Sequence, residues 1–373
     1  MKKILEMFGE PILNGGQETF AIGLLEVIDK NKFSCDFFTP YEVNNRYYEE
    51  IIRKNGGEIY SLGSDFKKKR YIYIFIQIYK FFKTNKYDIL HVNSGSTLFL
   101  AMVCLLSKIA GVKKTIVHSH CSGAKENIKH YIIKKISSPI FTLFADEICA
   151  CSYEAAKWKY PKRLIKERAV IVKNGIDTSV YRYRPYEREK LRNALGISKD
   201  EYVIGHVGRF TYEKNQKFLI ELVNEYVKYN DRIKLILVGD GDDFCKIKRM
   251  IRNYHLEAYV KMVGRTNEVD KYLQIFDVFV FPSLYEGLGT VAIEAQATGL
   301  PVIASSNVPE TIKILEKVCF ISLEAGKEMW IEKLEEYKKY IRERTSCDQA
   351  VINAGYSINY MGKQMESLFE KSL

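Results

Sequence analysis

Two glutamates around a glycine-rich turn are the residues of this sequence best suited to do chemistry. Glu286 and Glu294 are separated by seven residues, and the turn between them follows a short apolar run, Val278–Phe281, and leads into a helical pattern. A helix start presents unpaired backbone N–H groups to an anion such as a phosphate. Carboxylates accept hydrogen bonds from neutral hydroxyls, such as those of a ribose or a hexose. An ordinary helix cap would account for one glutamate but not for the whole arrangement.

Two cations follow another apolar run and suit the same kind of ligand. The run ends at Gly208 and Arg209, and Lys214 comes just before a second helical pattern. The two cationic side chains stand close enough to converge on one diphosphate, and a glycine lets the backbone approach it. Surface lysines are common, so Lys214 carries weight only together with Arg209.

A histidine pair ends a third apolar run. His118 and His120 follow Thr115–Val117, and the alternation of a strand would point both side chains to the same side of a sheet. A histidine at the end of a strand could donate a hydrogen bond to a substrate oxygen or stabilise developing charge. The alternative is a structural pair bonded to nearby backbone.

A glycine pair near the amino terminus is a weaker signal. Gly15 and Gly16 stand between an apolar run, Lys3–Phe8, and a helical pattern, Glu18–Ile28. They permit close approach of backbone to a ligand, and the helix start can attract an anion. The spacing differs from the G-x-G-x-x-G of dinucleotide sites, which counts against a dehydrogenase.

These residues stand where strands would end in two series of alternating strand and helix patterns, as in parallel βαβ units. The strand-like runs of the first half are KKILEMF, FSCDFFTP, YDILHVNS, KTIVHSH, DEICACS and AVIVKNGID, and those of the second half are YVIGHVGR, IKLILVGDG, YVKMVG, VFVFPS and PVIAS. The carboxyl ends of parallel strands are where such sheets bind ligands. The sequence therefore predicts an α/β protein with two open sheets.

The length of 373 residues favours two domains. The polar stretch Asp177–Lys199 separates the two series of strands and is the expected boundary. We expect an N-terminal domain over residues 1–180 and a C-terminal domain over residues 181–355. Residues 356–373 are expected to form an amphipathic helix that packs back on the first domain.

Composition indicates a globular protein of a reducing compartment. The eight cysteines form no Cys-x-x-Cys pair and no zinc-ligand spacing, so no metal site is expected. Glu6 and Glu10 interrupt the first apolar run before a secretory signal could form. The longest nearly uncharged stretch, Ser94–Ser107, is shorter than the ~20 residues of a membrane-spanning helix. We therefore expect a cytoplasmic protein.

Positive charge is concentrated in the first half of the chain. Residues 1–185 hold 30 Lys and Arg against 18 Asp and Glu, whereas residues 186–373 hold 27 against 28. This balance predicts affinity for nucleic acid or for the anionic surface of a membrane, unless it is simply a solvated basic face. No nucleic-acid motif accompanies the charge, so a basic nucleic-acid-binding protein is the weakest alternative.

Taken together, these stretches resemble the retaining group-one glycosyltransferases of GT-B fold (family 4 type), of the kind that build bacterial exopolysaccharide and capsule. The matching stretches follow the family's order along almost the whole chain and are NGGQE (14–18), HSH (118–120), KNGID (173–177), GHVGRFTYEKN (205–215), VGDGDD (238–243) and PSLYEGLGTVAIEAQATGLPVIAS (282–305). The resemblance implies a GT-B fold with two Rossmann-like domains facing each other across a cleft. The second domain would hold most of the nucleotide sugar.

The resemblance also implies roles for individual residues. Arg209 and Lys214 would hold the diphosphate of the donor, Glu294 its ribose hydroxyls, and Glu286 the hydroxyls of the donor sugar. His120, the better match of the pair, would face the donor, with His118 as the alternative. The residues expected to contact the sugar or the diphosphate through their backbone are Gly15, Gly16, Gly208, Gly287, Leu288, Gly289 and Thr290.

The chemistry implied by the resemblance is transfer with retention, in which the leaving phosphate and the attacking hydroxyl interact directly. No protein nucleophile and no cofactor would be needed, and clustered cations would replace a metal at the departing diphosphate. The donor would be a nucleotide-diphosphate sugar with uridine as the expected base, and the acceptor a sugar or a lipid-linked saccharide. Asp240 and Asp242 have the spacing of a metal-binding pair but stand in a glycine turn.

Two residues depart from the family pattern. Leu288 stands where Phe or a small residue is common, and Cys121 stands where Asn or Asp is frequent. Both positions would lie near the donor sugar or the acceptor. They therefore bear on the identity of the donor rather than on the class of reaction.

A basic and aromatic segment, Phe66–Phe82, suggests contact with an anionic membrane. Four cations, Lys67–Arg70, precede YIYIFIQIYKFF, which as a helix would be apolar nearly all round. The cations would lie at lipid headgroups, so that the enzyme is peripheral at the inner face of the cell membrane. The alternative is a helix packed on the first sheet.

A nucleotide-sugar epimerase of the same fold is the alternative enzyme. It needs the same nucleotide contacts but works by acid–base chemistry on the hexose. It would convert a nucleotide sugar with no acceptor present.

Overall fold

The computed structural model describes residues 1–13, 15–63, 71–120 and 128–371, which divide into two compact units. The first unit comprises Met1–Gly175 and Ser357–Leu373, and the second comprises Ile176–Tyr356. The sequence placed the division after residue 180, whereas the contacts place it after Gly175. Asn14, Cys121 and the predicted headgroup-binding cations of residues 67–70 lie outside the described residues.

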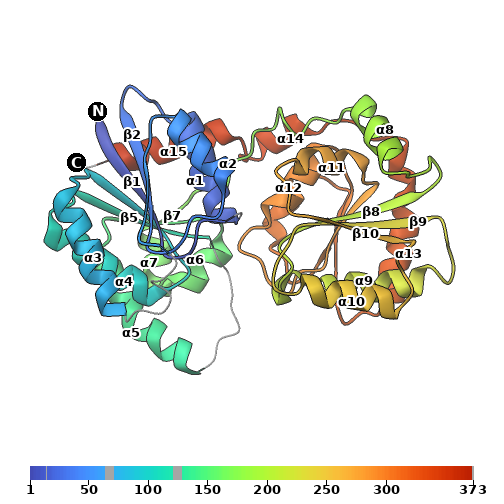
Figure 1. Ribbon diagram of the computed structural model, residues 1–373, viewed down its shortest axis with the longest axis horizontal. Coiled ribbons are helices and arrows are strands. Elements are labelled where there is room, and N and C mark those ends of the chain that lie inside the picture. Colours follow the sequence, from blue (N-terminus) through green and yellow to red (C-terminus); the bar gives the residue numbers. More distant parts are fainter. Residues whose placement is uncertain (14, 64–70, 121–127, 372–373) are drawn as a thin grey trace. The chain divides into compact units, whose positions relative to one another are not determined.

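The first unit contains a seven-stranded parallel sheet in the order β3-β2-β1-β4-β5-β6-β7 (Figure 1). Its strands are β1 (Lys2–Phe8), β2 (Phe33–Thr39), β3 (Ile59–Ser61), β4 (Ile89–Asn93), β5 (Lys114–Ser119), β6 (Glu147–Ala150) and β7 (Ala169–Ile171). Its helices are α1 (Gly16–Val27), α2 (Arg46–Lys54), α3 (Tyr71–Thr84), α4 (Thr97–Ala110), α5 (Ile128–Phe144), α6 (Tyr153–Lys159), α7 (Lys162–Glu167) and the C-terminal α15 (Ile358–Glu370).

The second unit contains a six-stranded parallel sheet in the order β10-β9-β8-β11-β12-β13. Its strands are β8 (Tyr202–Val207), β9 (Ile233–Val238), β10 (Val260–Gly264), β11 (Val278–Phe281), β12 (Val302–Ser305) and β13 (Val318–Ile321). Its α-helices are α8 (Pro185–Ala194), α9 (Gln216–Tyr226), α10 (Phe244–Asn253), α11 (Val269–Ile275), α12 (Thr290–Ala297), α13 (Lys327–Tyr337) and α14 (Asp348–Asn353).

The predicted α/β class with two parallel, Rossmann-like sheets is confirmed. All eleven strand-like runs form strands, because a strand covered by helices on both faces reads as a nearly continuous apolar run. Two edge strands were missed: β3 is only three residues long and follows a polar loop, and β13 directly follows the loop Lys313–Lys317. β3 has too few residues to predict a strand alone. β13 is a run of four apolar residues, as long as β11 and β12, and was overlooked in the sequence.

The C-terminal helix α15 is part of the core of the first unit. Met361, Met365 and Phe369 are buried in it, and the ring of Phe369 lies 5.7 Å from that of Phe33 on β2. Lys114 at the start of β5 donates from its buried Nζ to the carbonyl oxygen of Leu368, at 2.5 Å. A cation at the end of a helix satisfies carbonyl groups that have no partner within the helix.

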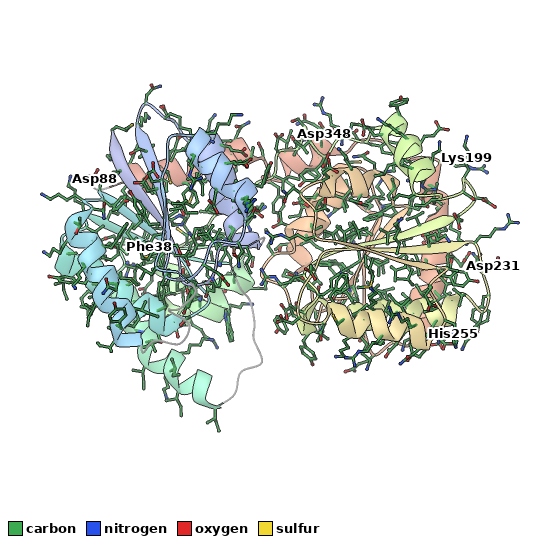
Figure 2. All side chains as sticks on the ribbon, viewed as in Figure 1. Phe38, Asp88, Lys199, Asp231, His255 and Asp348 are labelled. Carbon is green, nitrogen blue, oxygen red and sulfur yellow. The ribbon has the colours of Figure 1, made fainter. Side chains whose placement is uncertain are left out.

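The two edges of the second sheet differ in what they carry. Figure 2 shows Lys199, Asp231 and His255 in exposed loops, and each precedes a strand of this sheet. These loops mark the amino edge of the sheet. The turns that the sequence marked for chemistry all follow strands and therefore lie at the carboxyl edge. None of the helices in the described ranges is long and apolar enough to cross a membrane.

Candidate functional site

The candidate residues of the second unit lie on both sides of the point where the sheet changes its direction of winding. β8 lies between β9 on one side and β11 on the other. Arg209 and Lys214 follow β8, and Glu286 follows β11. Connections leave such a point in opposite directions, so open α/β sheets bind their ligands there.

Lys214 and Glu286 form an ion pair at this point. Lys214 Nζ lies 2.5 Å from Glu286 Oε1, and the side chains are 21% and 9% exposed. Ser283 donates from its hydroxyl to the same carboxylate oxygen at 2.8 Å. Lys214 Nζ also lies 5.5 Å from the centre of the Phe281 ring. The ammonium group of Lys214 and the carboxylate of Glu286 thus lie side by side, and these contacts restrict the orientation of both side chains.

Two hydrogen bonds join the loop that carries Lys214 to the loop that carries Glu286. Asn215 adopts a left-handed backbone, with φ of 55°, and its amide donates to the carbonyl oxygen of Pro282 at 3.1 Å. The backbone N–H of Leu284 donates to the carbonyl oxygen of Glu213 at 2.8 Å. Sequence reasoning missed Ser283 and Asn215 because their partners lie in another loop. The left-handed backbone of Asn215 could not be predicted from its residue type alone.

The turn Gly239–Gly241 supports the backbone around Arg209. A side chain at Gly239 would place Cβ only 2.1 Å from the carbonyl oxygen of Gly208, and Phe210 donates its N–H to the carbonyl oxygen of Asp240 at 3.0 Å. The close approach therefore requires glycine. Arg209 itself is exposed, and within the described ranges its guanidinium forms no ion pair.

The turn before α12 is shaped by Gly289, whose φ is 85°. A Cβ at this position would lie 2.8 Å from the Phe281 ring, so both conformation and space call for glycine. Thr290 is the first residue of α12, and the helix start presents backbone N–H groups beside the turn. The side chain of Leu288 is 3% exposed and packs inward. Only the backbone of Leu288 is therefore available to a ligand in this conformation.

Glu294 lies in the second turn of α12 and is buried. Burial raises the pKa of its carboxyl group from 4.5 to about 7, and the negative charge of Asp270 adds to the effect. A hydrogen bond from Tyr181 acts in the opposite direction. The structure thus joins Lys214 with Glu286 and gives Glu294 a different partner, Tyr181, which sequence reasoning did not identify. A carboxyl group with a pKa near 7 is typical of functional sites.

In the first unit, the histidine pair belongs to a buried polar chain that spans three strands. Glu6 on β1 accepts a hydrogen bond from His91 Nδ1 on β4 at 2.8 Å, and His91 Nε2 lies 3.2 Å from His118 Nδ1 on β5. Asn93 donates from Nδ2 to Glu6 Oε2 at 3.0 Å, and its Oδ1 lies 2.9 Å from His120 Nε2. The rings of His118 and His120 lie 4.1 Å apart, so both point to the same side as predicted.

This chain determines which nitrogen of His120 carries the proton. The carboxylate of Glu6 can only accept, so the amide nitrogen of Asn93 faces Glu6. The amide oxygen of Asn93 then faces His120 and accepts a hydrogen bond from Nε2–H. Burial lowers the pKa of His120 to about 3, so the ring is neutral near pH 7. His120 Nδ1 is then an acceptor. A hydrogen bond between His120 and the side chain of Asn174 acts against burial and raises the pKa of the ring. Nε2 of the fully buried His118 has no hydrogen-bond partner among the described residues.

Gly15 and Gly16 stand at the start of α1, as the sequence predicted. Gly15 is the residue before the first helical turn, with φ of −119°, and provides no side-chain cap. A Cβ at Gly16 would lie 4.0 Å from the amide nitrogen of Asn174, which leaves the helix start open on that side. β1 lies between β2 and β4, so these glycines follow an interior strand of the first sheet.

The two units are α/β domains of the GT-B type. At the carboxyl edge of the second sheet, a lysine, a glutamate and the start of a helix lie close together. Comparison with known proteins agrees. A family model described as glycosyl transferases group 1 matches residues 187–343, and one described as glycosyltransferase family 4 matches residues 14–180. The putative glycosyltransferase EpsF of Bacillus subtilis is 30% identical over 323 residues, which cover 85% of this chain and 83% of EpsF. The chain belongs to the group 1 glycosyltransferases.

Two further proteins are similar to this chain. A protein of Escherichia coli named UDP-Gal:alpha-D-GlcNAc-diphosphoundecaprenol alpha-1,3-galactosyltransferase is 29% identical over 242 residues, which cover 62% of this chain and 61% of the relative. Anabaena HepE, solved in complex with UDP and glucose, has a TM-score of 0.80 over 100% of both chains at 18% identity. At that identity the structural match supports the fold alone.

Proposed function

We propose that this glycosyltransferase moves a hexose, with retention, from a nucleotide-diphosphate sugar to a sugar or lipid-linked saccharide in the synthesis of a surface polysaccharide. A UDP-sugar is the proposed donor. The observation that carries the proposal is the Lys214–Glu286 pair beside the start of α12. A cation and a helix start suit a diphosphate, and a carboxylate suits a sugar hydroxyl. The UDP and the undecaprenol-linked acceptor in the name of the E. coli relative support the same reading.

In this proposal the second unit provides most of the contacts with the donor. Arg209 and Lys214 bind the diphosphate, Glu294 accepts hydrogen bonds from the ribose, and Glu286 accepts one from the sugar. The exposed guanidinium of Arg209 supports its part, because it is available to an anion. The lysine ammonium has three donors, so it can keep its bond to Glu286 while it binds a phosphate oxygen. Backbone groups of Gly208 and of Gly287–Thr290 complete the contacts.

The first unit contributes Gly15, Gly16 and His120 in this proposal. The start of α1 approaches the diphosphate. His120 accepts a hydrogen bond at Nδ1 from a sugar hydroxyl, because its single proton is held at Nε2 by Asn93. The sequence had suggested that this histidine donates a hydrogen bond. The polar chain favours the opposite direction.

The proposed transfer needs neither a protein nucleophile nor a metal or other cofactor. The attacking hydroxyl and the leaving phosphate interact on the same face of the sugar, and Arg209 and Lys214 stabilise the charge that develops on the diphosphate. The proposed place of action is the cytoplasmic face of the cell membrane, where a nucleotide sugar can meet a lipid-linked acceptor.

A panel of nucleotide sugars, offered with free and lipid-linked saccharide acceptors, tests this function. We expect transfer from a UDP-sugar, a product with the anomeric configuration of the donor by NMR, and unchanged turnover in the presence of EDTA. An inverted product would contradict retention, and loss of turnover with EDTA would contradict metal independence. Conversion of the nucleotide sugar with no acceptor present would indicate an epimerase instead.

The variant Arg209→Ala tests the assignment of the diphosphate site. We expect UDP affinity to fall about ten-fold or more, because a charged hydrogen bond contributes ~1.5–3 kcal/mol. The fold should be intact, because the side chain is exposed. Arg232→Ala is a matched control, since Arg232 is 69% exposed and pairs with Asp200 before β8. Equal UDP affinity of Arg209→Ala and wild type would refute the assignment.

A further inference from the structure

The exposed aliphatic side chains of this protein are gathered on three helices. In the described part of the chain, every exposed Ile and Leu lies on α3, α4 or α5 of the first unit. The exposed large hydrophobic residues of the second unit are tyrosines, Val180 and Met329. Single exposed hydrophobic residues are normal on a protein surface, but a cluster of them marks a surface that binds something.

Helix α5 exposes most of its aliphatic side chains, although the ring of Phe141 is buried. Ile132, Ile136 and Leu143 are 51%, 63% and 75% exposed, whereas Ser137 and Thr142 are only 2% and 3% exposed. The Ser137 hydroxyl donates to Thr97 of α4 at 2.7 Å, so this polar side chain lies in the contact with the neighbouring helix. A helix on the surface of a globular domain normally has the reverse pattern. The outer face of α5 is therefore suited to an apolar environment.

Helices α3 and α4 extend this surface. Figure 1 shows α3, α4 and α5 side by side on the first unit, and α4 packs against both of the others. Ile72 and Ile76 on α3 are 61% and 44% exposed, and Ile109 on α4 is 56% exposed. The sequence had offered either membrane contact or packing on the sheet for α3. The structure shows one side packed, with Ile74 and Ile78 buried, and the other side exposed.

The charge of the three helices has one sign. Their sequences contain no Asp or Glu, although they span 14, 14 and 17 residues. Exposed lysines lie among the apolar side chains, at Lys80 and Lys83 on α3 and at Lys135 on α5. The surface formed by the exposed residues of α3, α4 and α5, here called the α3–α5 face, is thus both apolar and cationic.

We propose that the α3–α5 face docks on an anionic phospholipid bilayer. The isoleucines and leucines enter the boundary between headgroups and acyl chains, and the lysines pair with lipid phosphates. A second copy of this chain is a poor occupant, because a symmetric contact would bring lysines against lysines with no carboxylate between them. The α3–α5 face includes none of the residues that are proposed to bind the donor.

Vesicle binding of one triple variant tests this proposal. Purified full-length protein is mixed with vesicles of phosphatidylglycerol and phosphatidylcholine, or of phosphatidylcholine alone, and sedimented. We expect the wild type to prefer the anionic vesicles. Ile132→Gln combined with Ile136→Gln and Leu143→Gln should weaken that binding by about ten-fold or more, because the apolar contact is lost. The substituted side chains are exposed, so the fold should be unchanged.

The matched control carries three substitutions on the second unit. Tyr229→Gln, Tyr254→Gln and Met329→Gln replace side chains that are 78%, 41% and 50% exposed, and should leave vesicle binding as in wild type. A third variant, Lys80→Ser with Lys83→Ser and Lys135→Ser, should lose the preference for anionic vesicles. Transfer to a soluble acceptor should be unchanged in all three variants. This readout separates a failure of the docking proposal from a failure of the proposed function.

Three outcomes would overturn the proposal. One is equal vesicle binding by the wild type and the α5 variant. Another is a wild type that does not bind either kind of vesicle. The third is a wild type that self-associates by light scattering and becomes monomeric in the α5 variant, which would make the face a contact between copies of this chain.

Discussion

The proposed contact of Glu294 with the ribose predicts that nucleotide binding is sensitive to pH near neutrality. Its carboxyl group has a pKa of about 7, raised from 4.5 chiefly by burial. Ribose hydroxyls that donate to the carboxylate bind the ionised form. We therefore expect the affinity for UDP to rise with pH up to about 7, with a slope that approaches ten-fold per pH unit below it. Isothermal titration calorimetry between about pH 5.5 and 8 would measure this profile.

The variant Glu294→Gln should bind UDP about ten-fold or more weakly, with a flatter pH profile. Burial also has a consequence for stability. Between pH 4.5 and about 7 the folded protein holds a proton that the unfolded chain has lost, so Glu294 lowers the free energy of unfolding as pH rises through this range. The control Glu310→Gln, at an exposed carboxylate, should keep the wild-type profile. A wild-type UDP affinity that does not change with pH would contradict the assignment.

Asn93 is predicted to position His120 for the reaction. In Asn93→Ala the Nε2 proton of His120 loses its acceptor, so the two neutral forms of the ring mix. We expect kcat to fall about ten-fold, as for an impaired hydrogen-bonding group at a reacting centre. UDP affinity should stay within about two-fold of wild type, because neither Asn93 nor His120 is among the proposed contacts of the nucleotide. A normal kcat at an unchanged melting temperature would show that this chain does not position His120.

At the scale of elements, Arg344 holds together the ends of two helices that flank the site. Its buried guanidinium donates to the carbonyl oxygens of Leu273 and Phe276 at the end of α11, and to that of Thr298 at the end of α12. Burial lowers the pKa of Arg344 to about 9, so it is still charged near pH 7. The end of α12 thus depends on a residue far along the chain.

Arg344→Met should destabilise the second unit by about 3 kcal/mol, because several buried carbonyl groups would lose their donor. Urea unfolding followed by fluorescence would measure the change. Arg342→Met, two residues earlier at an exposed position, is the matched control and should be nearly neutral. A neutral Arg344→Met would mean that the two helix ends are held by other contacts.

At the scale of the whole molecule, each unit has its own core and should respond separately to heat and ligand. We expect UDP to raise the melting temperature of the second unit more than that of the first, because most of the proposed nucleotide contacts lie in the second unit. Met365→Ala with Phe369→Ala should destabilise the first unit by at least ~2 kcal/mol, since both side chains are buried in its core. Differential scanning calorimetry would separate the two transitions. A single transition that both changes move together would contradict independent units.

Much of the fold and part of the candidate site could be predicted from local patterns. Strands covered on both faces are apolar runs, so the main strands of both sheets were recognisable. Arg209, Lys214 and Glu286 were singled out because each follows such a run, and the ends of parallel strands meet at one edge of a sheet. The edge strand β3 was not predicted, because three residues are too few to show the alternation or the apolar run of a strand.

The partners of the site residues could not be predicted. Lys214 and Glu286 are 72 residues apart, and Glu6 and His91 are 85 apart, so each pair meets only because the strand order places their strands side by side. The inverted face of α5 was missed for a related reason. Its sequence shows the periodicity of a helix but not which element the helix packs against. Only its packing on α4 shows that Ser137 is buried and that Ile132 and Ile136 are exposed.

The sequence by itself determined the α/β class, the main strands and the types of residue at their carboxyl ends, because these depend on backbone preferences and on periodic burial within a few residues. Only the tertiary structure decided which charges pair, which nitrogen of His120 carries its proton, how buried Glu294 is, and which face of α5 is exposed. Those properties depend on groups brought together from distant parts of the chain, and no local pattern specifies them.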